Sequence, residues 1–135
     1  MTLNKKLQFN KQILNKHKIA GLILFGSQIK GNKHPKSDID VAVIFEKPSI
    51  RLQKPVEVYG DLYAMLAPLV KSDENLDIVY LDEAPINLKF KAMEEGKPLY
   101  IHNPRFFADF RERTMLEYFD FKPVLDESNQ IFLDK

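Results

Sequence analysis

The stretch Leu22-Ile-Leu-Phe-Gly-Ser27, followed after ten residues by Asp38-Ile-Asp-Val-Ala-Val43, decides the fold. Apolar residues run almost without interruption over 19–25, which predicts a strand covered on both faces. The Gly-Ser pair that follows it predicts a tight turn. A second strand is predicted over 37–45, with its acidic end at the start and its apolar end as the anchor.

Two aspartates open the second predicted strand. Successive side chains of a strand point to opposite faces, so Asp38 and Asp40 project from the same face with their carboxylates close together. Such a pair is stable at neutral pH only when one carboxylate is protonated or a cation lies between them, and Mg²⁺ is a cation that prefers oxygen ligands. The spacing therefore indicates a divalent-metal site.

The turn between the two strands supplies groups that suit a phosphate. Gly26 lets the backbone approach an anion without a Cβ in the way, and Ser27 adds a hydroxyl donor. A Gly-Ser pair alone is usually only a turn, and an Asp-x-Asp alone is usually a solvated strand edge. Their combination at the ends of two apolar strands predicts a nucleoside triphosphate bridged to the carboxylates by Mg²⁺.

A third carboxylate is predicted to join the first two from a neighbouring strand. Asp77 lies near the start of the short β-rich run 76–81, and pairing of this run with the acidic strand would bring a third oxygen ligand to the same metal. By residue chemistry alone it has three competitors, Asp61, Asp73 and Asp82. The strand setting favours Asp77.

The remaining periodicity predicts the elements that surround these strands. Helices are predicted over 3–17, 56–70, 85–95 and 105–119, and a further strand over 97–101. Residues 46–55 are predicted to form a connecting loop with room to lie over the nucleotide. Tyr59 and Tyr63 fit the apolar stripe of their helix and are predicted to lie in the core, whereas His17 is predicted at the surface.

Composition restricts the class of protein. The chain has 135 residues, 44% of them hydrophobic and 29% charged, which suits a single domain over 1–135. A formal net charge of +1 argues against a nucleic-acid binder that acts through bulk charge, so no direct nucleic-acid contact is expected. There is no cysteine to form a thiolate metal site, and no apolar run long enough to span a membrane. A cytoplasmic location is expected.

The motifs Gly26-Ser27, Gly31 and Ser37-Asp38-Ile-Asp40 together resemble the signature of the DNA polymerase β-like nucleotidyltransferases, and in particular their minimal, MntA-like branch. The resemblance covers most of the chain. It implies an α+β, palm-like fold with a small mixed β-sheet flanked by helices. The family often carries arginines after the Gly-Ser pair, where this chain has Gln28 and Lys30, and a lysine keeps the charge without the planar guanidinium.

The resemblance also implies an activity. Members of the family transfer a nucleotidyl group from a triphosphate, and two Mg²⁺ ions assist this chemistry. It implies Asp38, Asp40 and Asp77 as metal ligands and catalytic residues, and Gly26, Ser27 and Lys30 as contacts of the triphosphate. MntA-like proteins are antitoxins that use ATP to place AMP on a tyrosine of a HEPT-type RNase toxin, which implies such a toxin as the partner.

The end of the chain is predicted to contact this partner. Residues 119–135 lie beyond the last predicted helix and carry more apolar groups than a small sheet can cover, which is typical of an interaction surface. The segment Tyr118-Phe-Asp-Phe-Lys-Pro123 resembles the one by which MntA-like proteins associate with the toxin. Two other interpretations stay open: transfer of AMP to a small molecule such as an aminoglycoside, and a non-catalytic antitoxin that acts by binding alone.

Overall fold

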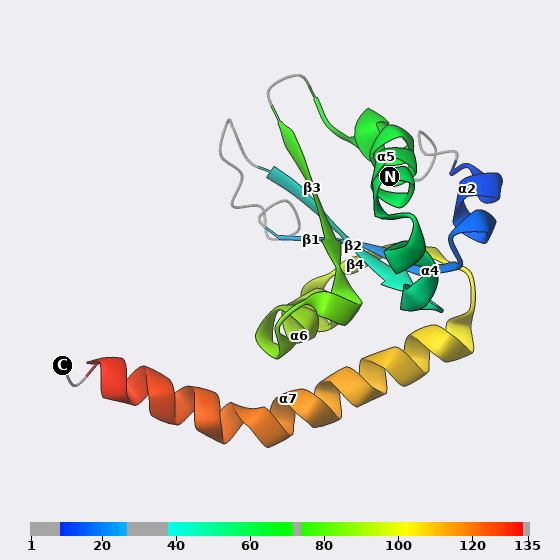
Figure 1. Ribbon diagram of the computed structural model, residues 1–135. Coiled ribbons are helices and arrows are strands. Elements are labelled where there is room, and N and C mark those ends of the chain that lie inside the picture. The colour runs from blue at the N-terminus through cyan, green and yellow to red at the C-terminus, as the bar shows by residue number, and fades with distance from the viewer. Residues whose placement is uncertain (1–8, 27–37, 72–73, 134–135) are drawn as a thin grey trace.

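The computed structural model describes residues 9–26, 38–71 and 74–133 of the protein (Figure 1). Its four-stranded sheet contains β1 (Ile19–Phe25), β2 (Asp38–Phe45), β3 (Asn75–Tyr80) and β4 (Lys97–Ile101) in the spatial order β3-β2-β1-β4. β1 pairs antiparallel with β2 and β4, whereas β2 pairs parallel with β3. The small mixed sheet predicted for this fold class is therefore confirmed, and the two motif-bearing strands form its centre.

Helices cover both faces of the sheet (Figure 1). They are α2 (Lys11–Lys16), α4 (Pro48–Gln53), α5 (Pro55–Leu66), α6 (Ile86–Glu95) and α7 (Pro104–Leu133), with short 3-10 turns η1 (Ala67–Leu69) and η2 (Leu81–Glu83). Side chains of α2 and α5 pack on one face, and side chains of α6 and α7 pack on the other. No helix in the described part of the chain has the length and apolar run needed to cross a bilayer.

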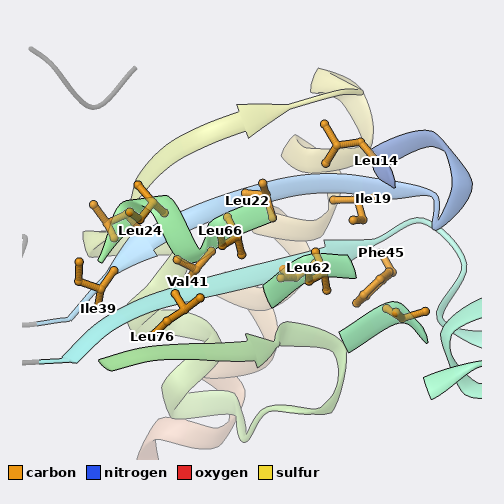
Figure 2. Close-up of a cluster of buried hydrophobic side chains, with 13 residues drawn as sticks. Leu14, Ile19, Leu22, Leu24, Ile39, Val41, Phe45, Leu62, Leu66 and Leu76 are labelled. Atoms are coloured by element: carbon orange, nitrogen blue, oxygen red, sulfur yellow. The ribbon is translucent and has the colours of Figure 1, made fainter. Parts of the chain in front are cut away.

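The α5 face of the sheet holds the larger hydrophobic cluster (Figure 2). Leu22 and Val41 of the central strands pack there with Leu62 and Leu66 of α5, and all four side chains are fully buried. Full burial stabilises a leucine or valine by about 1.5–3 kcal/mol relative to exposure. This cluster therefore provides much of the free energy that holds the two motif-bearing strands together.

The opposite face of the sheet holds a second cluster. Ile23 and Phe25 of β1 and Ala42 and Ile44 of β2 are buried there against α6, and α7 adds partly buried aromatic side chains. The side chains of β1 enter the two clusters in turn, and β2 and β4 flank the strand on its two edges. All seven of its residues, Ile19 to Phe25, are therefore buried. The continuous apolar run of the sequence is explained by this double coverage.

Two helices differ from the prediction because of their prolines. Residues 46–55, predicted as a loop over the nucleotide, contain α4, and Pro48 and Pro55 begin α4 and α5. A proline at the first helical position loses nothing, because that N–H has no intrahelical partner. α4 also follows the last residue of β2, at the opposite end of the strand from the acids, so it does not lie over the predicted site.

The ends of the chain differ from the prediction as well. Within the described residues the first helix begins at Lys11, because Asn10 caps it by accepting hydrogen bonds from the backbone N–H of Gln12 and Ile13 at 2.9 and 3.3 Å. The predicted helix covers 3–17, and its residues 3–8 lie outside the described residues. The last helix does not end at residue 119: α7 continues through Pro123 to Leu133 as one helix that changes direction along its length (Figure 1). The predicted tail is therefore helical.

The prediction that Tyr59 and Tyr63 lie in the core is wrong. The inward side of α5 is the i, i+4, i+8 row Val58, Leu62 and Leu66, which leaves both tyrosines on the outer side of the helix. Their side chains are exposed by 45% and 43%, and the two rings stack on each other with centroids 6.1 Å apart. Tyr59 and Tyr63 each stand next to a buried residue of this row in the sequence. The predicted apolar stripe included them, but the buried side of the helix is narrower than that stripe.

Candidate functional site

Strands β2 and β3 bring two of the predicted acids together. The strands run parallel, and Asp40 is the direct partner of Asp77 in the register. Adjacent strands lie about 4.8 Å apart, and opposed residues of a parallel pair point to the same face. That face is the α6 side of the sheet, since Ala42 and Val79, each two residues further on, both pack there. Asp77 is exposed and Asp40 half-buried.

The third predicted acid, Asp38, lies at the start of the same strand as Asp40. Asp38 is the first residue of β2, two residues before Asp40, and its partner in the register is Asn75. The structure thus gives the backbone position of Asp38 in β2, and the common face of Asp38 and Asp40 stays a prediction from their two-residue spacing. Of the predicted triphosphate contacts, Ser27 and Lys30 lie outside the described residues.

Gly26 lies directly against the carboxylate of Asp40. It follows the last residue of β1, and that residue, Phe25, is the register partner of Asp40. Gly26 has a φ of +98°, in the region that favours glycine, and a Cβ built on it would collide with Oδ2 of Asp40. A backbone without a side chain is therefore required at this corner, next to the acids.

The competing acids are engaged elsewhere. Asp61 accepts a hydrogen bond from His17 Nε2 at 2.8 Å, which lowers the pKa of the carboxyl group. Asp82 accepts two hydrogen bonds from Arg51, at 2.6 and 2.7 Å. Asp73 lies outside the described residues. Of the three candidates within the described residues, Asp77 is the one that the structure places beside Asp40.

The prediction that His17 is a surface residue is wrong. His17 comes directly after the last residue of α2. Its side chain is only 2% exposed, because it lies between α2 and α5, where it is hydrogen-bonded to Asp61. No local pattern predicts this contact, because Asp61 is 44 residues away along the chain. The residue serves to join two helices on the face away from the acids.

Among the described residues, a cluster of one histidine and two acids has its side chains close enough together to share a cation. Donor atoms of His17, Glu57 and Asp61 all lie within 4.8 Å of one another. Lys16 already provides positive charge there, with Nζ 2.7 Å from Glu57 and 3.6 Å from Asp61. Its hydrogen bond to Glu57 raises the pKa of Lys16 and lowers that of Glu57. This group is a compensated ion cluster between α2 and α5, separate from the predicted site.

Comparison with known proteins agrees with the geometry at the strand ends. Residues 8–105 match the profile described as "Polymerase beta, Nucleotidyltransferase". The chain belongs to this nucleotidyltransferase family. The matched range includes both motif-bearing strands, the Gly-Ser corner and β3, so the polymerase β-type nucleotidyltransferase fold and the enzyme class are established for this chain.

Individual relatives within the nucleotidyltransferase family are more specific. The chain is 28% identical over 106 residues to "Protein adenylyltransferase MntA" of Aphanizomenon flos-aquae (strain 2012/KM1/D3), covering 76% of this chain and 71% of that one. It is thus a homologue of MntA. It also matches a chain of a toxin–antitoxin crystal structure with AMP-PNP, with 25% identity and a TM-score of 0.60, covering 98% of this chain and 96% of that one.

A third relative shows the same fold at lower identity. It is a chain of the structure of tri-AMPylated Shewanella oneidensis HEPN toxin in complex with MNT antitoxin, with 22% identity and a TM-score of 0.55. The match covers 92% of this chain and 89% of that one. The overall architecture is therefore shared along nearly the whole length of the nucleotidyltransferase chains.

The residues at the corner fit the metal and the nucleotide that such a nucleotidyltransferase uses. Carboxylate oxygens from two adjacent strands form a hard donor set of the kind that Mg²⁺ prefers, and no sulfur ligand competes. The absence of a side chain at Gly26 lets the carboxylate of Asp40 lie against the backbone there. The observed register thus brings together carboxylates of the kind that bind Mg²⁺, next to a glycine that has no side chain to displace them.

The sequence alone did not single out one further polar residue at this corner. Asn75 stands two residues before Asp77, as Asp38 stands two residues before Asp40, and the register pairs Asn75 with Asp38. The signal was the repeated spacing of a polar residue and an acid at the start of two successive strands. It becomes meaningful only once the two strands are known to be parallel and in register.

Proposed function

We propose that this protein is a Mg²⁺-dependent protein adenylyltransferase antitoxin that transfers AMP from ATP to a tyrosine of a cognate HEPT-type RNase toxin and thereby neutralises it. The observation that carries the proposal is the register of Asp40 opposite Asp77, beside a glycine corner that a side chain would close. The names of the relatives support the acceptor class, since they describe an adenylyltransferase and an AMPylated toxin.

The proposed reaction is the transfer of AMP from ATP to the oxygen of the acceptor tyrosine. The tyrosine oxygen attacks the α-phosphorus of ATP, a new P–O bond forms, and the bond to the bridging oxygen of pyrophosphate breaks. In this proposal Asp77 accepts the proton of the hydroxyl group, and Gly26, Ser27 and Lys30 hold the triphosphate. Asp38, Asp40 and Asp77 would hold the Mg²⁺ ions, which are two in this proposal. When bound, the metals lower the pKa of the hydroxyl and stabilise the leaving pyrophosphate.

The end of α7 provides the contact with the toxin in this proposal. Leu116, Phe119 and Phe121 are exposed by 61%, 59% and 46%, which leaves apolar surface unused by the body of the protein. In Figure 1 the last part of α7 continues past α6 on the side where β1 ends and β2 begins. The part of α7 from residue 119 to 133 thus extends from the body on the side of the acids. We place the reaction in the cytoplasm, where ATP is available.

The experiment that tests the function is mass spectrometry of the partner. The protein is incubated with MgCl₂, ATP and the toxin encoded beside it, and the toxin is expected to gain the mass of one or more AMP groups. Asp40→Asn and Asp77→Asn are expected to reduce the transfer rate by more than about 100-fold, because each removes a ligand worth several kcal/mol in the transition state. The exposed Asp109→Asn on α7 is the matched control.

Each other outcome points to a different function. A stable complex and a neutralised toxin without any change in mass would show that the protein acts by binding alone. Transfer of AMP to an aminoglycoside in the absence of the toxin would show a small-molecule enzyme. Transfer at the wild-type rate by Asp40→Asn would refute the site, whichever acceptor is used.

A further inference from the structure

Asn75 is the first residue of the edge strand β3. Its neighbour Leu76 is buried in the α5-side cluster, together with the partly buried Ile78. Side chains of a strand alternate, so Asn75 is directed to the opposite face, the one shared by Asp40 and Asp77. Asn75 is exposed, so its amide is available to another molecule on the acid-bearing face.

The order of the strands determines which substrate reaches this residue. Gly26 marks the end of β1, the acids of β2 come next, and Asp77 and Asn75 lie on β3 at the edge of the sheet. With the triphosphate at Gly26, the acceptor hydroxyl must approach the α-phosphorus from the far side for an in-line attack. That side is β3, and within the described residues no further strand pairs with it.

The chemistry of the side chain suits a contact with a polypeptide acceptor. A fourth carboxylate beside Asp38 would add like charge to a site that is already acidic. An amide is neutral, and it both donates and accepts hydrogen bonds, so it matches the peptide groups and the hydroxyl of a tyrosine-bearing segment. A metal ligand at this position would gain from a negative charge that asparagine lacks.

We infer that Asn75 is a positioning residue, which hydrogen-bonds the acceptor segment and holds its tyrosine hydroxyl next to Asp77. This inference rests on the proposed function, and it adds the part of the site that recognises the acceptor. Asn75 acts on the acceptor only, so the binding of ATP and metal does not depend on it.

The test compares Asn75→Ala with Asn87→Ala, the same substitution at an exposed position near the start of α6. The kcat/KM for the toxin is expected to fall about 3- to 10-fold in Asn75→Ala, the effect of one lost hydrogen bond, and to stay unchanged in Asn87→Ala. The KM for ATP, and the Kd of Mg²⁺·AMP-PNP measured by calorimetry, are expected to stay within about twofold. Thermal unfolding of each variant verifies the fold.

A second substitution separates acceptor positioning from metal binding. Asn75→Asp loses the donor and adds charge, so kcat/KM for the toxin is expected to fall here too, without tighter Mn²⁺ binding in calorimetry. Wild-type kcat/KM in Asn75→Ala, or a change in ATP or Mn²⁺ affinity in place of the toxin effect, would overturn the inference. If Asp77→Asn abolishes transfer while Asn75→Ala does not alter it, only this inference fails. If the wild-type protein transfers no AMP, the proposed function fails with it.

Discussion

At the scale of single residues, the contact of Gly26 with Asp40 is the most constrained feature of the site. A positive φ and a neighbouring carboxylate oxygen both exclude a side chain there. Gly60, in the middle of α5, has no such reason: a Cβ built on it would meet nothing within 4 Å. The two glycines therefore form an internal comparison of a required and a dispensable glycine.

Gly26→Ala is expected to destabilise the protein by about 1–3 kcal/mol, because alanine is strained at this φ and its methyl group displaces the carboxylate of Asp40. AMP transfer should fall with it. Gly60→Ala is expected to stabilise by about 0.5–1 kcal/mol, since alanine is the better helix former. Urea unfolding and the transfer assay measure both. A Gly26→Ala protein with wild-type stability and activity would contradict the described corner.

The hydrogen bond between His17 and Asp61 makes a pH-dependent contribution to stability. It holds the pKa of Asp61 below its usual value of 3.8 in the folded protein. A carboxyl group whose pKa is lower in the folded than in the unfolded state stabilises the fold fully above the unfolded value. That contribution is lost as the pH falls from there through the folded-state pKa.

Asp61→Asn is accordingly expected to flatten the acid dependence of stability. The free energy of unfolding of the wild-type protein should fall more steeply than that of Asp61→Asn as the pH decreases below the usual carboxyl pKa, whereas the two slopes should agree near neutrality. Urea unfolding at a series of pH values measures this difference. Asp109→Asn, at an exposed position on α7, should keep the wild-type slope. If the free energies of unfolding of Asp61→Asn and wild type change in parallel with pH, this hydrogen bond does not contribute to the acid dependence of stability.

At the scale of elements, a single buried arginine closes the end of the parallel strand pair opposite to the acids. Arg51 of α4 has its guanidinium carbon 4.9 Å from the ring centroid of Phe45 and 4.6 Å from that of Tyr80, the last residues of β2 and β3. It also binds Asp82 and Glu83 just beyond β3. By joining both strand ends, this arginine helps to fix the register that places Asp40 opposite Asp77.

Arg51→Leu is expected to cost about 3 kcal/mol of stability, because it leaves a partly buried carboxylate without its partner. Arg111→Leu, which removes the half-exposed pair with Glu94 at 3.1 Å, should cost less than about 1 kcal/mol. Thermal and urea unfolding compare the two variants. Equal losses would show that burial of Arg51 adds nothing to the strength of its ion pairs.

Elements with a continuous or strictly spaced apolar pattern were predictable from the sequence. β1 and β4 have the predicted bounds, and β2 and β3 start within one residue of them. The errors arose where a local rule has two outcomes. Proline ends many helices, but Pro48 and Pro55 begin helices here, and Pro123 lies within one. The partners of His17 and Arg51 depend on contacts distant in sequence, which no local pattern reveals.

Some residues of the candidate site were predictable from the sequence alone, whereas others required knowledge of the strand register. The two-residue spacing of Asp38 and Asp40 fixes their common face from the chain alone. Choosing Asp77 among four acids required the guess that its strand lies beside β2, and the parallel register supports that choice. The importance of Asn75 depends on that register and was not predictable without it.

At the scale of the whole molecule, the two ends of the proposed reaction lie on one side of the sheet. The acids belong to the face covered by α6 and α7, and α7 carries exposed apolar residues beyond this cover. The opposite face is covered by α2 and α5, and exposed apolar residues occur away from α7 too: Leu52 of α4 and Val56 of α5. The exposed apolar residues of α7 can therefore be tested as the partner surface, with Leu52 and Val56 as the control.

The double variant Leu116→Ser/Phe121→Ser is expected to weaken the complex with the toxin by about tenfold or more, since buried apolar anchors dominate interface energies. Its stability should change by less than about 0.5 kcal/mol per site, because both side chains are exposed. Leu52→Ser/Val56→Ser is the matched control and should bind normally. Calorimetric titration with the toxin measures the affinity of each variant. Equal affinities of the two double variants would exclude α7 as the contact.

The shared face of α7 and the acids has a consequence for the rate of the proposed modification. A toxin held by the end of the helix is tethered to the enzyme, so its tyrosine meets ATP as an intramolecular neighbour. Tethering of this kind gives an effective concentration in the millimolar range. The acids and Asn75 then need only weak affinity of their own for the acceptor. A short tyrosine peptide, cut from the rest of the toxin, would be a far poorer substrate than the intact protein.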